Sequence, residues 1–191
     1  MPNSKITFQL EIIKRHDAYI ATANTKAGMI LSFSIAFISV LIATTPIFWS
    51  LNNSQWYKSS ITIIALILFI GLLTSIIKSF FAIFPNVTRG ANESLISFVH
   101  TSSFDGGAEA YFQAVKSGSD DATLKDLCYQ SFILSEIARD KFSQIKTAVN
   151  AIKFSSLAAT ALIICIIAGS VVEHNMSIVP SAPSAEGKAS E

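Results

Sequence analysis

The sequence predicts an all-α membrane protein with three transmembrane helices and a helical cytoplasmic bundle. Hydrophobic residues make up 51% of the 191 positions and charged residues only 14%, whereas soluble domains average about 25% charged residues. Three stretches with almost no charge are long enough to cross the hydrocarbon core of a bilayer, which takes roughly 20 residues. Between and before them, apolar residues recur at helical spacing, and no β-rich region or internal repeat is present.

Charge and hydropathy divide the chain into seven segments. We expect a cytoplasmic amphipathic helix over 1–26, transmembrane helices over 27–49, 61–84 and 154–172, a short periplasmic turn over 50–60, a cytoplasmic helical segment over 85–153 and a disordered periplasmic tail over 173–191. Pro85 follows the second span, and proline cannot continue a helix. The tail has too few apolar residues to bury a core.

Two of the spans are predicted to continue helices that begin outside the membrane. The N-terminal helix runs into the first span without a helix breaker, and none occurs between Ala122 and Gly169. Two short helices, over 92–100 and 108–116, are expected before Ala122. The fold class therefore places the N-terminal helix and the helix over 122–153 together below the membrane, each continuous with a span.

The distribution of basic residues predicts the topology. Twelve of the fourteen Lys and Arg residues lie in the N-terminal arm or from Lys78 to Lys153, the other two being Lys58 and Lys188. Basic residues near transmembrane helices are concentrated on the cytoplasmic side. We therefore expect a cytoplasmic N-terminus and a periplasmic C-terminus.

Two polar residues fall on the apolar face of the N-terminal helix. Apolar residues recur in steps of four and three from Ile6, and the same steps land on Asp17 and Asn24. Burying either group without a partner would cost about 1–3 kcal/mol. One interpretation is a polar position that fixes which helices pair. The other is a ligand or gating site between helices.

Three cations lie where they could meet a phosphate group: Lys26, Arg89 and Lys141. Lys26 stands where the first span begins, and its ordinary role there would be to carry its ammonium to the headgroups. Arg89 and Lys141 have the same two interpretations, a solvated surface or a contact to a single phosphodiester charge.

Catalytic and metal-dependent functions find no support in the sequence. The pair His16-Asp17 could supply two ligands of a hydrolytic metal site, but such a site needs further converging ligands, and only His100 and His174 remain as histidines. The two cysteines form no zinc or disulfide pattern. A net charge of +1 gives no bulk attraction to nucleic acid. We expect no enzyme activity, no metal and no resident cofactor.

Three motifs resemble those of the transmembrane effectors of Pycsar anti-phage systems. The first, leading into the first span, is Arg15-His16-Asp17-x-Tyr19-Ile20-x-x-Ala23-Asn24-x-Lys26-Ala27. The second is the Phe84-Pro85 exit from the second span. The third, in the late helix, comprises Leu127, Tyr129-Gln130, Leu134-Ser135, Ile137 and Lys141-Phe142. The resemblance covers nearly the whole chain except the tail.

The resemblance implies a function in abortive infection. In such systems a partner pyrimidine nucleotide cyclase makes cyclic CMP or cyclic UMP, and the effector responds by impairing the bacterial inner membrane. The cytoplasmic part of this chain is too short and too helical for a β-roll nucleotide module, so we expect the nucleotide among helices or between protomers. Its expected contacts are Asp17, Asn24, Lys26, Arg89 and Lys141.

Three spans are too few to enclose a pore, so disruption of the lipid bilayer would require a homo-oligomer. Two other classes stay open at this point. A constitutive, holin-like pore-former would be toxic on expression alone and indifferent to Asn24→Ala. A passive membrane scaffold would leave the membrane intact and co-purify with a protein partner.

Overall fold

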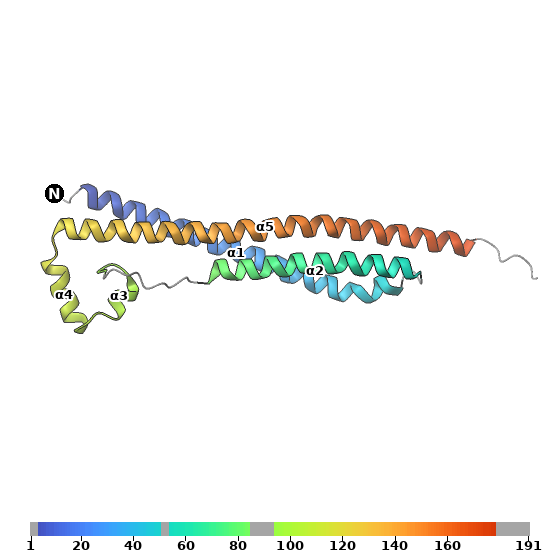
Figure 1. Cartoon of the computed structure of the whole chain (residues 1–191), viewed down its shortest axis with the longest axis horizontal. Coiled ribbons are helices and arrows are strands. Elements are labelled where there is room, and N and C mark those ends of the chain that lie inside the picture. Colours follow the sequence, from blue (N-terminus) through green and yellow to red (C-terminus); the bar gives the residue numbers. More distant parts are fainter. Residues whose placement is uncertain (1–3, 51–53, 85–93, 179–191) are drawn as a thin grey trace, which may run out of the picture. The chain divides into compact units, whose positions relative to one another are not determined.

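The chain is all-helical in the ranges that the structure describes. A computed structural model describes residues 4–50, 54–84 and 94–178, with side chains as far as Val172. Figure 1 shows its helices, which are α1 (Ser4–Ser50), α2 (Gln55–Ile83), α3 (Phe98–Ser102), α4 (Gly107–Ser117) and α5 (Asp120–Ile178). Within those ranges α1, α2 and α5 are long and apolar enough to cross a membrane. The predicted all-α class with three candidate spans is confirmed.

The two helices predicted to continue into spans, α1 and α5, are unbroken. α1 has 47 residues and continues through Pro46, four residues before its end. α5 has 59 residues and continues through Gly169, and Figure 1 shows it as one uninterrupted ribbon. The N-terminal helix and the late helix therefore each continue into an apolar segment.

Several helix bounds differ from the helices and turns that the sequence predicts. α2 begins at Gln55, so the six residues 55–60 extend the second helix rather than forming a turn, and α5 runs to Ile178 into the predicted tail. The short helix expected over 92–100 is only Phe98–Ser102. Ser94 explains the difference, because its side-chain oxygen accepts from the backbone N–H groups of Ile96 and Ser97; such local bonds compete with helix formation.

The helix expected over 108–116 is confirmed as α4. It begins at Gly107, directly after Gly106, and both glycines have positive φ, at 73° and 86°, a conformation that glycine adopts without steric cost. α5 begins beside Ser119, whose hydroxyl oxygen accepts from the backbone N–H of Ala122 at 3.2 Å, as an N-cap residue does. The remaining predicted turn and tail residues, 51–53 and 179–191, and the segment 85–93 lie outside the described residues.

The segment before α4 is fastened to α5 by side-chain hydrogen bonds. The backbone N–H of Leu95 donates to Asp126 at 2.9 Å, and the Gln130 amide donates to the Ser94 hydroxyl at 2.9 Å. The Tyr111 hydroxyl donates to the Leu95 carbonyl at 2.8 Å. The first two contacts hold Ser94 and Leu95 against the beginning of α5, and the third joins Leu95 to α4.

Two compact units share the three long helices. Unit 1 comprises Met1–Ile35 and Leu73–Ala151. Its core, which we call the alanine cluster, consists of Ala23, Ala27, Ala82 and Ile145. Small residues at a helix contact allow the backbones to approach closely.

Unit 2 comprises Ala36–Leu72 and Ile152–Glu191. Its core is built from large aliphatic side chains, which we call the leucine cluster: Leu41, Ile61, Leu68, Leu72 and Leu162. Gly169 lies directly against the ring of Tyr57, where an added Cβ would come within 2.0 Å of the Tyr57 Cε2 atom. Glycine is therefore required there for α5 to pack against α2.

Candidate functional site at Lys141

The buried face of α1 lies slightly to one side of the predicted face. Ala23 and Ala27 are fully buried, whereas Asn24 is only partly buried and Asp17 is exposed. Leu10, on the predicted face, is 43% exposed. The prediction that Asp17 is buried was therefore wrong, because the contact on α1 is made by Ala23 and Ala27, of which only Ala27 lies on the predicted face.

A lysine lies among the buried residues of α5. Ala138, Lys141, Ile145 and Ala148 are buried, whereas the neighbouring Phe142 is 37% exposed. Lys141 is only 7% exposed. Lysine is almost never buried to this degree unless its charge is satisfied, so its partners define the site.

The Lys141 ammonium joins three helices within unit 1. It donates to the side-chain oxygen of Asn24 on α1 at 2.9 Å. It also donates to the backbone carbonyls of Ala82 and Ile83 at the end of α2, the second at 3.4 Å. These carbonyls belong to the last turn of α2, whose carbonyl groups have no partner within the helix. Lys141 therefore caps α2 and ties it to α1.

The partners of Lys141 are all formally neutral. The partial negative charge at a helix C-terminus, about half an elementary charge, favours a cation there. It does not match a full ammonium charge, and burial lowers the pKa of the Lys141 amine. No described carboxylate lies within ion-pair distance of Lys141. The site therefore holds a buried cation that lacks a full counter-charge.

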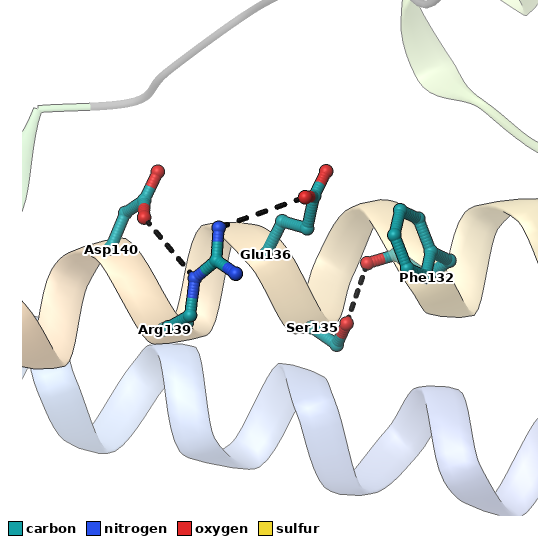
Figure 2. A network of polar contacts seen from close by, with 5 residues as sticks. All are labelled: Phe132, Ser135, Glu136, Arg139 and Asp140. Atoms are coloured by element: carbon teal, nitrogen blue, oxygen red, sulfur yellow. Dashed lines mark hydrogen bonds and ion pairs between the residues drawn. The ribbon is translucent and has the colours of Figure 1, made fainter.

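The acidic residues nearest to Lys141 in sequence are engaged elsewhere. Figure 2 shows the Arg139 guanidinium between two carboxylates of the same helix, Glu136 at 3.7 Å and Asp140 at 3.6 Å. Arg139 and Asp140 are mostly exposed, so these pairs contribute little to stability. They do, however, pair the Asp140 carboxylate with Arg139 and not with Lys141.

A hollow of about 530 Å³ opens beside Lys141. It is lined by Phe81, Phe84, Ile137, Asp140, Lys141, Ser143 and Gln144. Small-molecule sites have volumes of about 300–1,000 Å³ and combine apolar walls with a few polar groups. The Gln144 side-chain oxygen is buried and has no hydrogen-bond partner among the described residues. An unpaired buried acceptor costs about 1–3 kcal/mol, so a donor from a ligand would relieve it.

Of the five predicted contact residues, the structure brings two together, Asn24 and Lys141. Asp17 and Lys26 are exposed on α1. Arg89 lies outside the described residues. Within the described residues no group of three or more His, Cys, Asp or Glu side chains could hold a metal ion.

Sequence reasoning did not find Gln144 or the α2 carbonyls. Gln144 stands three residues after Lys141 and so points to the same side of α5, but only the correct register reveals this. The carbonyls of Ala82 and Ile83 carry no sequence signal beyond the proline that follows at position 85.

Comparison with known proteins identifies the family. The Pycsar effector protein domain, PycTM, matches residues 8–169. The chain is also 36% identical over 156 residues to the Pycsar effector protein EcPycTM of Escherichia coli, an alignment that covers 78% of this chain and 83% of that protein. The chain belongs to the Pycsar effector family. No solved structure is significantly similar to it.

Membership of the Pycsar effector family confirms the resemblance seen in the sequence motifs. The protein is a Pycsar transmembrane effector of anti-phage defence. The family match spans α1, α2 and most of α5, so it includes all three candidate spans and every residue of the Lys141 site.

Proposed function

We propose that this effector binds a cyclic pyrimidine mononucleotide, cyclic CMP or cyclic UMP, made by a partner cyclase. Binding causes it to impair the inner membrane, so that the infected cell dies before phage spread. It acts as a membrane effector and not as an enzyme. The nucleotide contacts include Asn24 and Lys141. Further contacts, from the edge of the site or from another protomer, come from Asp17, Lys26 and Arg89.

The buried Lys141 ammonium is the observation that carries the proposal. It is 7% exposed, and its described partners are neutral oxygens. A cyclic mononucleotide carries a single phosphodiester charge, which would complete the neutralisation of one ammonium. Charge-assisted hydrogen bonds are roughly twice as strong as neutral ones. A Pycsar effector with such a cation therefore has a physical reason to prefer its anionic ligand.

The connection to the membrane follows from the elements that Lys141 joins. Its partners lie on α1 and α2, and Lys141 itself lies on α5, the three helices long and apolar enough to span a bilayer. A ligand shifts a conformational equilibrium only by its different affinities for the two states. A site that touches all three helices can supply that difference.

Topology and assembly complete the proposal. The distribution of basic residues supports a cytoplasmic N-terminus and a periplasmic C-terminus at the inner membrane, and the cyclic nucleotide is made on the cytoplasmic side. Three helices cannot enclose a pore, so several copies act together as a homo-oligomer in the lipid bilayer.

The test is dye permeability of the inner membrane in cells that express the effector without its cyclase. We expect permeability to rise when cyclic CMP or cyclic UMP is supplied and to stay low with cyclic AMP. Equal permeability without any nucleotide would favour the constitutive, holin-like pore-former. An intact membrane under every condition, together with a co-purified protein, would favour the passive scaffold.

A further inference from the structure

We infer that the hollow beside Lys141 is the nucleotide site, and that the ligand phosphate takes Lys141 away from the end of α2. This rests on the proposed function and adds two things to it. It names Phe81, Phe84 and Gln144 as ligand contacts, and it makes the contact between Lys141 and α2 a latch that binding opens.

The lining of the hollow matches each part of a cyclic mononucleotide. Lys141 supplies a cation for the phosphodiester. Phe81 lies in the last turn of α2 and Phe84 directly follows that helix. The two residues are 61% and 56% exposed, which suits stacking of their rings on a planar base. The buried and unpaired oxygen of Gln144 can accept from a ring N–H or an exocyclic amine. Three different groups thus converge on one hollow.

The latch follows from counting donors. A lysine ammonium has three N–H donors, and here it has three acceptors: Asn24, Ala82 and Ile83. Each phosphate oxygen that binds Lys141 must therefore displace one of them, and the two free oxygens of a phosphodiester can displace both carbonyls. The hollow is bordered by Phe81 and Phe84, which flank the two carbonyls in sequence, so a ligand there meets the α2 side of the ammonium.

Displacing the carbonyls uncaps the C-terminus of α2. Its last carbonyl groups then lose the partner that burial requires. Asn24 stays bonded to Lys141, so the link between α1 and α5 persists while α2 is released. The nucleotide therefore acts on one end of a candidate span without breaking the rest of the alanine cluster.

The first test uses the wild-type full-length protein in nanodiscs of phosphatidylcholine. Hydrogen exchange is measured for amides in the last turn of α2, residues 79–83, with and without saturating cyclic CMP or cyclic UMP. We expect exchange to become faster with the nucleotide that binds. Unchanged or slower exchange in this turn, under conditions where binding is measured, overturns the latch.

The second test removes the charge. In dye-loaded vesicles, Lys141→Met is expected to leak without any nucleotide, because nothing caps α2. The matched control is Lys146→Met, at an exposed position on the same helix, which is expected to stay tight. A tight Lys141→Met protein that is inserted at the wild-type level contradicts the latch. If Lys141→Met is not inserted, the hydrogen exchange of the wild type decides.

The third test weakens the site at two residues. Asn24→Asp gives Lys141 a carboxylate partner that competes with the ligand phosphate, and we expect the nucleotide concentration for half-maximal leakage to rise on the order of fivefold. Gln144→Leu removes one acceptor and should raise the Kd of the nucleotide by about three- to tenfold. Gln113→Leu, on exposed α4, is the control. An unchanged Kd for Gln144→Leu contradicts the assignment of the hollow.

Failure of the proposed function gives a different pattern from failure of this inference. If the wild type neither binds nor responds to cyclic CMP or cyclic UMP, the proposed function is wrong, whatever Lys141→Met does. If the wild type responds but its α2 exchange is unchanged, only the latch is wrong. Vesicles containing phosphatidylglycerol form a further arm, since faster α2 exchange caused by that lipid alone would assign the hollow to a headgroup phosphate instead.

Discussion

The two units of the protein pack their helices together with different kinds of side chain. The alanine cluster of unit 1 is small, and beside it a buried lysine bonds to two other helices. The leucine cluster of unit 2 consists entirely of aliphatic side chains. Lipid tails are as apolar as leucine, so apolar contacts in a bilayer contribute through shape and packing rather than through burial from water. Packing in unit 2 depends on the shapes of its aliphatic side chains, whereas unit 1 contains a contact whose strength depends on charge.

This difference teaches where sensitivity to a ligand can reside. Tightly packed aliphatic side chains have one preferred arrangement and no group that a nucleotide could address. The Lys141 contacts can be exchanged for a better acceptor without opening a cavity.

Leu68→Ala should destabilise unit 2 more than any other change considered. Leu68 is 1% exposed in the leucine cluster, and truncating a buried leucine costs about 2–5 kcal/mol because a cavity remains. Chemical unfolding in detergent measures this difference. Leu66→Ala, two residues earlier on the same helix and 56% exposed, should stay within about 0.5 kcal/mol of the wild type. Equal effects of the two changes would show that the cluster is not a packed core.

One substitution, glycine to alanine, should have opposite signs in the two units. Gly169→Ala would place a Cβ 2.0 Å from the Tyr57 ring, and such overpacking costs about 1–3 kcal/mol. Gly28→Ala meets nothing within 4 Å and should stabilise α1 by about 0.5–1 kcal/mol through helix propensity. Thermal melting of the purified protein compares them. Stabilisation by Gly169→Ala would contradict the close approach of α5 to Tyr57.

The sequence predicted the elements of unit 1 better than their register. Unbroken helices through the span boundaries follow from the absence of breakers between Ala122 and Gly169, and the structure has them. On α1 the buried contact is made by Ala23 and Ala27, of which only Ala27 lies on the predicted face. The large residues of that face did not mark the contact, since Leu10 is 43% exposed.

The candidate site was only partly predictable for the same reason. Asn24 and Lys141 could be named from the sequence, but their mutual contact depends on Lys141 being buried while the neighbouring Phe142 is 37% exposed. The acceptors on α2 are backbone carbonyls, which every residue has, so no residue type marks them. Gln144 becomes visible only when its oxygen is seen to be buried without a partner.

The pH dependence of stability should distinguish Lys141 from the apolar core. Burial lowers the pKa of its amine below the ordinary 10.5, so between the two values the unfolded chain binds more protons than the folded one. The free energy of unfolding then rises with pH in that window. The cost of burying the charged Lys141 amine is felt in full below the lowered pKa and is gone above 10.5.

The measurement is the difference in unfolding free energy between the wild type and Lys141→Met, followed from pH 7 to 10.5. We expect the wild type to gain stability relative to Lys141→Met as the pH rises. Leu68→Ala, measured in the same way, should show a constant difference from the wild type. A falling difference for Lys141→Met would mean that the folded protein stabilises the charged amine.

The smallest expected effect concerns a second polar contact in unit 1. The Ser34 hydroxyl donates to the Ser75 hydroxyl at 3.1 Å, and both side chains are fully buried within candidate spans. Hydrogen bonds between membrane helices average about 0.6 kcal/mol in double-mutant cycles, because the separated helices also find partners. We expect Ser34→Ala and Ser75→Ala to show a coupling of this size. A coupling near zero would leave Lys141 to set the pairing of α1 with α2, whereas one above about 1.5 kcal/mol would make the serine pair a competing determinant of that pairing.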